Sequence, residues 1–404
     1  MMFYKETNFK DTEIGRIPKD WEVSKLEKIC KKIKAGGTPL TTKKEFWNGN
    51  IPFVKIEDMT SCGKYLIKTS SSITKAGLEN SNAWLVPENS LLLAMYGSLG
   101  EVSINTINVA TNQAILGIIP KEKDDVEFLY YWFLYFKPCW RKFAKPTTQA
   151  NLTAEIVRNS TIPLPPSQER KKIAEILLTV DEAIQKTNEI IAKTERLKKG
   201  LMRELLTKGI GHKEFKDTEI GRIPKEWEVV KLGRIFSFKN GQRPKLLETE
   251  KIPVYGANGI MGYTNEFLVD NDFIIIVGRV GASGEVHLGQ GKIWVSDNAI
   301  YSESYEKSKV YPPFVYYLLK FKGLGRFASK TTHPIITQTF LNNFQIQLPS
   351  TLEQQKIAEI LSTFDKKLEI ERNEKAKLEK IKQGLMDLLL TGKIRVKVNS
   401  NGRF

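Results

Sequence analysis

The chain has 404 residues and a formal net charge of +16, with 62 Lys and Arg against 46 Asp and Glu. This length predicts more than one domain, and a hydrophobic content of 41% excludes a largely disordered chain. The charge favours a polyanionic partner, nucleic acid ahead of a membrane surface, although a solvated Lys-rich surface would give the same value. The three cysteines form neither a metal-binding spacing nor a disulfide framework, and no apolar run is long enough to span a bilayer. We therefore expect a soluble protein of the reducing cytoplasm.

The opening segment of the chain occurs twice. Residues 9–26 read FKDTEIGRIPKDWEVSKL, and residues 215–232 read FKDTEIGRIPKEWEVVKL. A near-copy of this length predicts a duplicated architecture. Within it, a turn-forming proline precedes Trp21, which we interpret as a packing anchor rather than part of a ligand site.

A β-rich segment follows each copy. Residues 27–161 contain several short apolar runs separated by loops rich in Gly, Asn, Ser and Thr, where recognition residues usually lie. Residues 233–345 repeat this plan, and Gly281–Val286 matches Gly97–Val102. The opening segments are 206 positions apart but most later matches are 184 apart, a net loss of 22 residues in the second copy. The two copies therefore predict one scaffold with two different loop-bearing surfaces.

A long helix follows each β-rich segment. After the proline-rich residues 162–167, a seven-residue repeat predicts a helix to about Leu206, a rod of roughly 60 Å. One predicted row of this helix is Ile173, Val180, Thr187, Thr194 and Leu201, and a second is Ile176, Ala183, Ile190 and Leu197. A second helix is predicted after Pro349, with Glu371 interrupting its repeat. The residues that we predict to form the coiled coil or to contact a partner are Ile173, Leu177, Val180, Ile184, Ile191, Leu201, Ile357, Leu361, Phe364, Leu378 and Leu385.

No catalytic or metal-binding constellation is evident. The phosphate-binding pattern GxxxxGK[ST] is absent, and the three histidines are isolated along the chain, as expected for surface or loop residues. Glu169-x-Lys171 and Glu214-x-Lys216 resemble fragments of a nuclease site but lack a Pro-Asp partner, so a solvated charged face is the preferred interpretation. We predict no catalytic residue and no metal ligand.

Binding is the remaining role for the β-rich segments, in which basic and aromatic residues are interleaved. Lys and Arg can neutralise phosphates, and Arg can contact guanine edges with two hydrogen bonds. For any single residue, a solvated surface charge is about as good an interpretation as a DNA contact. The candidate DNA-binding residues are Lys43, Lys44, Lys55, Arg141, Lys142 and Lys145 in the first segment and Arg243, Lys245, Arg279, Arg326 and Lys330 in the second.

These features resemble the specificity subunit of type I restriction-modification systems over nearly the whole chain. The most specific matches are Ile14–Trp21 with its copy Ile220–Trp227, and Leu164-Pro165 followed by Gln168–Leu177 with its copy from Leu348 to Leu361. The resemblance and the repeat together predict an α+β fold of two similar β-rich target-recognition domains and two long helices packed as an antiparallel coiled coil, in a pseudo-two-fold internal repeat. The expected segments are residues 1–161 and 211–345 as recognition domains and residues 162–210 and 346–404 as spacer helices, the last with a basic tail.

The resemblance also implies a function. Each recognition domain would read one half of a split, asymmetric site in double-stranded DNA, and the helices would set the gap between the halves. The helices would dock two methyltransferase subunits, and two restriction (translocase) subunits would join them. The chain would not be catalytic by itself: S-adenosylmethionine, ATP and Mg²⁺ would be bound by the partner subunits, and no cofactor is expected in this chain.

Two other classes of function stay open at the level of the sequence. The chain could be a coiled-coil adaptor whose β domains bind ligands other than nucleic acid, or an enzyme acting alone on DNA. Salt dependence separates the first of these from a DNA-binding protein, because covering about 6–10 phosphates makes affinity fall roughly 10³–10⁵-fold between 50 and 200 mM salt. The second is disfavoured by the absence of a catalytic motif.

Overall fold

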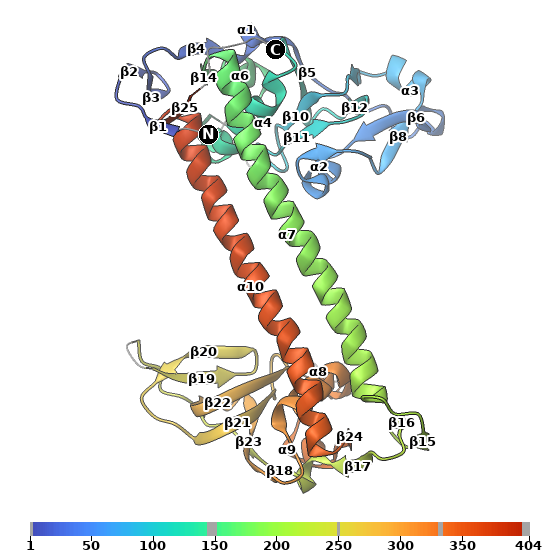
Figure 1. Ribbon diagram of the computed structural model, residues 1–404. Coiled ribbons are helices and arrows are strands. Elements are labelled where there is room, and N and C mark those ends of the chain that lie inside the picture. The colour runs from blue at the N-terminus through green and yellow to red at the C-terminus, as the bar shows by residue number, and fades with distance from the viewer. Residues whose placement is uncertain (1–2, 144–151, 249–250, 330–333, 398–404) are drawn as a thin grey trace. The chain divides into compact units, whose positions relative to one another are not determined.

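The computed structural model describes residues 3–143, 152–248, 251–329 and 334–397 (Figure 1). The chain forms two compact units. Unit 1 contains Met1–Lys186 and Lys375–Phe404, and unit 2 contains Thr187–Glu374. Each unit therefore combines one β-rich domain with part of each of the two long helices.

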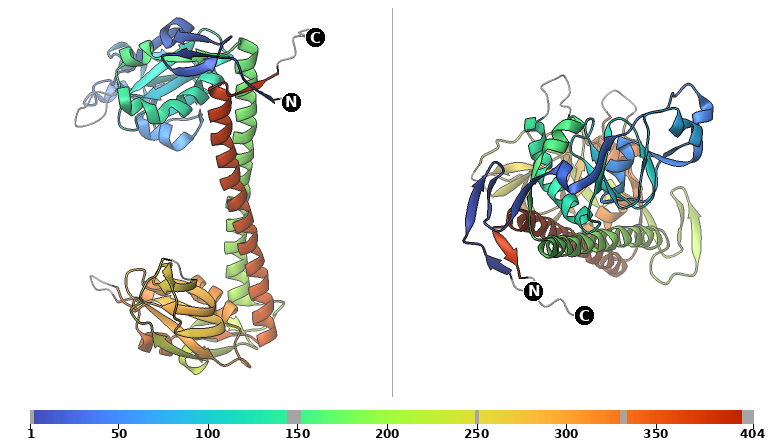
Figure 2. Two further views of the ribbon diagram at one scale, coloured as in Figure 1. Left: turned by 90° about the vertical axis from the view of Figure 1, so that its left-hand side faces the viewer. Right: turned by 90° about the horizontal axis from the view of Figure 1, so that it is seen from above.

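Unit 1 begins with a strand that pairs with the last strand of the described chain. Strand β1 (Phe3–Lys5) runs antiparallel to β25 (Ile394–Val396), as Figure 2 shows, so segments from opposite ends of the sequence lie side by side. The repeated opening segment then forms the hairpin β2 (Phe9–Thr12) and β3 (Gly15–Pro18). Strand β4 (Glu22–Lys25) pairs with β14 (Thr161–Leu164), which closes the β-rich domain between them.

The β-rich domain of unit 1 contains two sheets, antiparallel except where β7 meets β11 and where β6 meets β12. The five-stranded sheet has the order β5 (Cys30–Ala35), β13 (Ile115–Pro120), β10 (Ser90–Ala94), β11 (Val102–Asn105) and β7 (Tyr65–Leu66). The four-stranded sheet has the order β8 (Ser71–Ile73), β6 (Trp47–Val54), β12 (Val109–Thr111) and β9 (Leu85–Val86). The short helices are α1 (Leu26–Ile29), η1 (Lys44–Phe46), α2 (Ile56–Cys62), α3 (Lys75–Glu79), α4 (Asp125–Phe136), η2 (Lys137–Cys139), α5 (Trp140–Phe143) and α6 (Ala154–Asn159).

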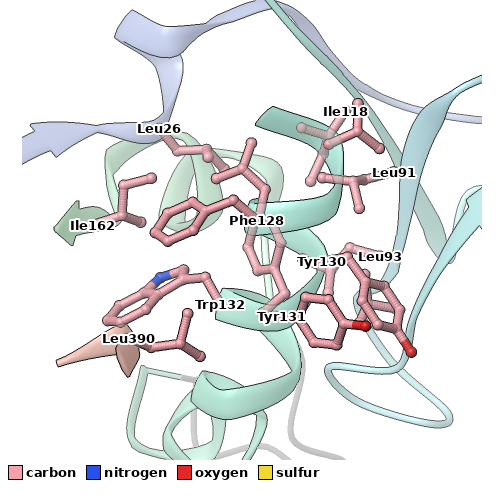
Figure 3. Packing of buried hydrophobic residues seen from close by; sticks show 14 of the residues in the cluster. Leu26, Leu91, Leu93, Ile118, Phe128, Tyr130, Tyr131, Trp132, Ile162 and Leu390 are labelled. Atoms are coloured by element: carbon pink, nitrogen blue, oxygen red, sulfur yellow. The ribbon is translucent and has the colours of Figure 1, made fainter. Parts of the chain in front are cut away.

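Helix α4 lies at the centre of the core of unit 1. Its aromatic side chains pack between Leu91 and Ile118 of the five-stranded sheet and Leu390 of a long helix (Figure 3). Phe128 and Tyr131 of this helix are completely buried, and so is Trp21 of the opening segment. Each large apolar side chain removed from water contributes roughly 1.5–3 kcal/mol, so α4 attaches the β-rich domain firmly to the helices. Trp21 is the packing anchor that the sequence predicts.

Unit 2 repeats the plan with a smaller domain. Hairpin β15 (Phe215–Thr218) and β16 (Gly221–Pro224) precedes β17 (Glu228–Lys231), which pairs with β24 (Gln345–Leu348). One sheet of six strands has the order β18 (Phe236–Asn240), β23 (Ala299–Tyr305), β21 (Val269–Gly278), β22 (Val286–Val295), β19 (Ile252–Gly256) and β20 (Gly259–Thr264). The short helices are η3 (Leu232–Arg234), α8 (Pro312–Lys322), η4 (Leu324–Phe327) and α9 (Gln338–Asn343).

The difference in size between the domains has a local cause. Between β6 and β10, unit 1 contains α2, β7, β8, α3 and β9, whereas only β20 lies between the corresponding strands β19 and β21 of unit 2. The residues missing from the second copy are therefore concentrated in this connection, where the sequence alone places them only somewhere before Gly281.

The two long helices are α7 (Ser167–Lys208) and α10 (Thr351–Leu390), and they pack antiparallel within each unit. In unit 1, Asp181 pairs with Lys382 while Glu169 contacts Arg395. In unit 2, Glu195 pairs with Arg372 while Lys198 pairs with Asp365. In these pairs, residue numbers rise along α7 as they fall along α10, so the pairs define the antiparallel register of the two helices. The seven-residue repeat could not define this register, because Glu371 interrupts it.

The residues predicted to form the coiled coil differ in how deeply they are buried. Ile173 and Leu177 of α7 and Ile357 and Leu361 of α10 are buried. The other predicted coiled-coil residues are half-buried, namely Val180, Ile184, Ile191, Leu201, Phe364, Leu378 and Leu385.

The second row predicted in α7 turns progressively towards solvent, and its prediction as a continuous buried seam is wrong. Ile176 is 8% exposed, but Ile190 is 41% and Leu197 is 55% exposed. A straight α-helix drifts about 20° per heptad relative to a strict seven-residue repeat. A row that begins at the edge of the interface can therefore move out of it along the helix, whereas Thr187 and Thr194 of the first row stay buried.

Candidate nucleic-acid interface

A buried cluster in unit 1 connects the opening segment to both long helices. The indole Nε1 of Trp21 donates to Oε2 of Glu169 at 3.2 Å, and Arg395 donates to the two oxygens of Glu169 at 2.6 and 2.7 Å. The same guanidinium bonds both oxygens of Asp20 at 2.9 and 2.8 Å and Glu6 at 2.7 Å. Burial lowers the pKa of Arg395, but its hydrogen bonds to Glu169 and Asp20 outweigh burial and raise that pKa overall.

This cluster corrects the interpretation of Glu169 as part of a solvated face. Glu169 is only 3% exposed, and its carboxylate is neutralised by an arginine 226 residues further along the chain. Because the arginine follows α10 while the glutamate lies in the first turn of α7, the contact ties the start of one helix to the end of the other.

Unit 2 contains an equivalent cluster with a different cation. Trp227 Nε1 donates to Oε2 of Glu353 at 3.0 Å, and His212 Nε2 lies 2.9 Å from Oε1 of the same residue. The backbone N–H of Ile210 also donates to Glu353 at 2.9 Å. His212 lies in the loop between α7 and β15, as the sequence predicts, but it is half-buried and bonded rather than isolated. Glu353 occupies in α10 the position of Glu169 in α7, and His212 takes the place of Arg395.

A second pair of equivalent contacts joins each domain to the middle of the helices. In unit 1, the hydroxyl of Tyr131 donates to Asp181 at 2.7 Å, and Lys382 pairs with that carboxylate at 2.6 Å. In unit 2, Tyr317 donates to Asp365 at 2.7 Å, and Lys198 pairs with the same aspartate. The pseudo-two-fold repeat therefore extends to individual hydrogen bonds, and each domain is held on its helices by the same two sets of contacts.

The candidate DNA-binding residues of unit 1 lie in separate places. Lys43 and Lys44 are exposed at η1, with the ammonium of Lys43 5.1 Å from the centre of the Phe46 ring. Lys55 is half-buried before α2, and Lys142 is exposed on α5. The side chain of Arg141 and the whole of Lys145 lie outside the described residues.

In unit 2, two loops that carry candidate DNA-binding residues contact the same segment of the chain. Arg243 and Lys245 are exposed in the loop after β18, and Arg279 is half-buried in the loop after β21. Arg326 is exposed in η4, where its guanidinium lies 4.8 Å from the Phe327 ring centre. Lys330 lies outside the described residues. Loops that begin at Gly241 and Arg279 both bond the segment 296–299, through Gly241 N–H to Ala299 O at 2.9 Å and Arg279 N–H to Asn298 O at 2.8 Å.

The same meeting of loops occurs in unit 1. Gly37 N–H donates to Thr111 O at 2.9 Å, and Met95 N–H donates to Ala114 O at 2.8 Å. Close approach requires glycine here: a Cβ on Gly36 would lie 1.9 Å from the Thr111 carbonyl oxygen, and one on Gly241 would lie 2.1 Å from that of Ser296. Each unit thus builds the same three-loop cluster, defined as residues 36–39, 95–100 and 111–114 in unit 1 and residues 241–244, 279–284 and 296–299 in unit 2.

The side chains of the three-loop cluster differ between the units. Thr38 donates to the exposed carboxamide of Gln113 at 2.6 Å in unit 1. Arg243, Arg279 and the exposed Asn298 occupy the cluster of unit 2. The sequence search for basic residues missed Gln113 and Asn298, although a carboxamide can bond adenine with two hydrogen bonds. A comparison of the sequences Gly36–Pro39 and Gly241–Pro244 is the signal that could have pointed to this loop cluster.

The described part of the chain contains no group of three His, Cys, Asp or Glu side chains placed to hold a metal ion. Within the same residues, no helix is both long and apolar enough to cross a membrane.

Two similar β-rich domains, each attached by a Trp–Glu cluster to the first turn of a long helix, define a duplicated recognition scaffold. The family model of the type I restriction modification DNA specificity domain matches residues 18–196 and 224–380. The chain is 32% identical to the type I restriction enzyme MjaVIII specificity subunit of Methanocaldococcus jannaschii, over 98% of both chains. It is 27% identical to the EcoprrI specificity subunit of Escherichia coli over 82% of this chain and 85% of that one.

Solved structures show the same fold. The S subunit of the type I restriction-modification system from M. genitalium superposes with a TM-score of 0.64 at 20% identity, covering 94% of this chain and 97% of that chain. The chain therefore belongs to the family of type I restriction-modification specificity subunits, with DNA target-recognition domains in an α+β fold.

Proposed function

We propose that the two β-rich domains read the two halves of a split, asymmetric site in double-stranded DNA. The supporting observation is the three-loop cluster, in which the two units have the same backbone contacts but different side chains. A common framework presents the loops in the same way, while Thr38 and Gln113 in unit 1 and Arg243, Arg279 and Asn298 in unit 2 give each half-site its own base preferences. Recognition residues on loops held by a rigid scaffold are the usual arrangement in binding proteins.

The basic residues predicted from the sequence belong to the same proposal. In unit 1, Lys43, Lys44, Lys55 and Lys142 are proposed phosphate contacts, with Arg141 and Lys145 from the sequence alone. In unit 2, Arg326 and Lys245 have that role, with Lys330 from the sequence alone. A net charge of +16 supports contact with a polyanion.

The helices would set the gap between the half-sites and bind the partner subunits. A 42-residue helix such as α7 is roughly 60 Å long, whereas one turn of DNA is about 34–36 Å. Large apolar side chains are exposed on both helices, among them Leu197, Ile370 and Ile381. Exposed apolar residues along one element support protein docking. We propose that the helices bind two methyltransferase subunits and that two restriction subunits join this complex in the cytoplasm. S-adenosylmethionine, ATP and Mg²⁺ would be bound by the partner subunits. This chain would not be catalytic by itself.

The proposed segments are residues 1–161 and 211–345 for recognition and residues 162–210 and 346–404 for spacing. Domain exchange tests them. Residues 233–343 would be replaced by the equivalent part of another specificity subunit, which leaves the β17–β24 pair native. A matched exchange of residues 27–160 leaves the β4–β14 pair native.

Each exchanged chain would be co-expressed with the methyltransferase subunit encoded in the same operon, and methylated bases would be mapped across a genome. We expect each exchange to change one half of a split motif and leave the other half and the gap unchanged. A change in both halves, or in neither, would contradict independent reading by the two domains. Binding to non-nucleic ligands with little salt dependence would instead indicate an adaptor, and methyl transfer by the purified chain alone would contradict the non-catalytic role.

A further inference from the structure

Two adjoining cavities in unit 2 are lined by more basic than acidic side chains. The larger has a volume of about 600 Å³ and the smaller about 400 Å³, and both have Lys322 and Arg326 in their walls. Arg222 also lines the smaller cavity, whereas Glu219, the acidic residue of the larger lining, accepts a hydrogen bond from Gln345. None of the three cations pairs with a carboxylate of the described chain, and the two arginines instead face aromatic rings. The cavities therefore have a net positive charge.

A buried carboxamide lies in the wall of the smaller cavity. Gln347 is 4% exposed, and its Nε2 donates to the backbone oxygen of Leu206 at 2.7 Å. Its Oε1 is buried and accepts no hydrogen bond from the part of the chain that the structure describes. A buried polar atom without a partner is rare in a native structure. Beside a cavity, it indicates a position where a bound molecule can donate a hydrogen bond.

Three phenylalanine rings line the larger cavity beside the same cations. The ring centre of Phe327 lies 6.1 Å from that of Phe340 and 5.4 Å from that of Phe344. Phe327 is 44% exposed, and the exposed residues Thr339 and Asn343 add polar groups to this lining. Aromatic side chains next to cations suit an anion that carries a flat ring. The volume is within the range of about 300–1,000 Å³ that is usual for small-molecule sites.

The fold does not require these polar residues, because unit 1 forms the same elements without them. Lys322 is the last residue of α8, and the last residue of α4 is Phe136, whose ring stacks on that of Trp132 at 5.8 Å. Gln347 has the register position in β24 that Pro163 has in β14. An apolar ring and a proline are therefore sufficient for folding at the two positions where unit 2 has an unpaired cation and a buried amide.

The charge of Lys322 is also in an unfavourable place. Burial lowers the pKa of Lys322, and the neighbouring Arg326 lowers it further. Both effects act against the charged form, so an anion placed between the two cations would stabilise it. A lysine that folding penalises and leaves without an ion pair indicates a role in binding rather than in structure.

We propose that the two cavities together bind one nucleoside diphosphate. Its ring lies against the aromatic wall of the larger cavity. Its phosphates lie between Lys322 and Arg326, which both cavities share, and extend to Arg222 in the smaller one. Because unit 1 lacks the equivalents of Lys322 and Gln347, one site per chain is expected. The inference goes beyond the proposed function and shares with it only Arg326, a proposed phosphate contact.

Isothermal titration calorimetry of the purified full chain with ADP tests this site. Lys322→Met removes the charge and keeps the length of the side chain. Lys320→Met, an exposed lysine of the same helix outside both linings, is the matched control. We expect one ADP per chain, an affinity reduced roughly 10–100-fold in Lys322→Met and an unchanged affinity in the control. Inorganic phosphate should compete with ADP but bind at least about tenfold more weakly, because it has no ring to stack.

Two further measurements separate loss of the site from loss of the fold and from a DNA contact. Tm of Lys322→Met should be equal to or above that of the unmodified chain, and ADP should raise Tm less in the variant. DNA affinity should be the same in Lys322→Met and Lys320→Met.

Several results would overturn the inference. These are no binding of ADP at millimolar concentration, two ADP molecules per chain, or an ADP affinity that Lys322→Met leaves unchanged. Equal affinities for ADP and inorganic phosphate would exclude a nucleotide. Weaker DNA binding by Lys322→Met in a chain that does not bind ADP would assign the cations to a DNA phosphate instead. The domain exchange does not depend on any of these results, so the proposed function and the nucleotide site can fail separately.

Discussion

Replacing Arg395 with methionine should selectively destabilise unit 1. The substitution leaves the buried carboxylate of Glu169 with the indole N–H of Trp21 as its remaining side-chain donor. The other two partners lose less, because the Asp20 side chain is 58% exposed and Glu6 keeps hydrogen bonds from the backbone of Thr7 and Asn8. The cost therefore comes mainly from Glu169. Breaking a buried ion pair by removing one partner costs about 3–5 kcal/mol.

Hydrogen exchange measured by mass spectrometry during urea unfolding would locate the effect. Protection should fall in β1, β25 and the first turns of α7, while peptides of unit 2 keep their protection. In a unit of this size each kcal/mol lowers Tm by about 2–4 °C, so Tm of unit 1 should fall by roughly 6–20 °C. Adding Glu169→Gln removes the buried charge and should recover much of the loss in a double-mutant cycle. A cost below about 1 kcal/mol, or an equal loss of protection in both units, would refute this reasoning.

Three further predictions follow from individual contacts. Hydrogen bonds from Arg395 hold the pKa of Asp20 below its usual 3.8. Because the pKa is lower in the folded than in the unfolded protein, the ionised carboxylate stabilises the fold above about pH 4, and this stabilisation is lost as the pH falls. The urea midpoint of unit 1 should therefore decrease below about pH 4, and it should decrease less in Asp20→Asn than in the unmodified chain. A drop of equal size in both would contradict this. Tyr131→Phe should cost about 1–3 kcal/mol in urea unfolding and more than Tyr317→Phe, since the Tyr131 hydroxyl also accepts from Lys64 at 2.9 Å; equal costs would exclude that role for Lys64. Gly36→Ala places a Cβ 1.9 Å from the Thr111 carbonyl oxygen and should impair recognition of one half-site only, which methylation mapping would reveal; unchanged methylation of both halves would count against the three-loop cluster.

The repeat and the helical periodicity could be predicted from the sequence because both are local. Sixteen of eighteen positions match between the opening segments, and α7 ends at Lys208, close to the predicted Leu206. The short apolar runs predicted in residues 27–161 include β10 and β11, which the turn at Gly97–Gly100 joins. Each of these signals lies within a few turns or one hairpin of chain, where spacing and turn residues suffice.

The contacts that hold the units together could not be predicted, because their partners are far apart in the sequence. Nothing near Glu169 distinguishes it from a solvated glutamate, and its cation is Arg395 at the other end of the chain. His212 likewise looks isolated until Glu353 is brought to it by the return of the second helix. The exposed Ile190 was mispredicted for a different reason: a seven-residue spacing does not by itself determine whether the helix supercoils enough to keep that spacing buried.

The discontinuity of unit 1 has a consequence for synthesis on the ribosome. Unit 2 is made of one continuous segment, Thr187–Glu374, whereas unit 1 needs Lys375 onwards to complete its core with Leu390 and to pair Glu169 with Arg395. At roughly 5–20 residues per second, about 10–40 s separate the emergence of the two parts of unit 1. The second half of the protein can therefore finish folding before the first, and the nascent amino-terminal domain must wait with an uncovered apolar surface, which is the period in which it would depend most on chaperones.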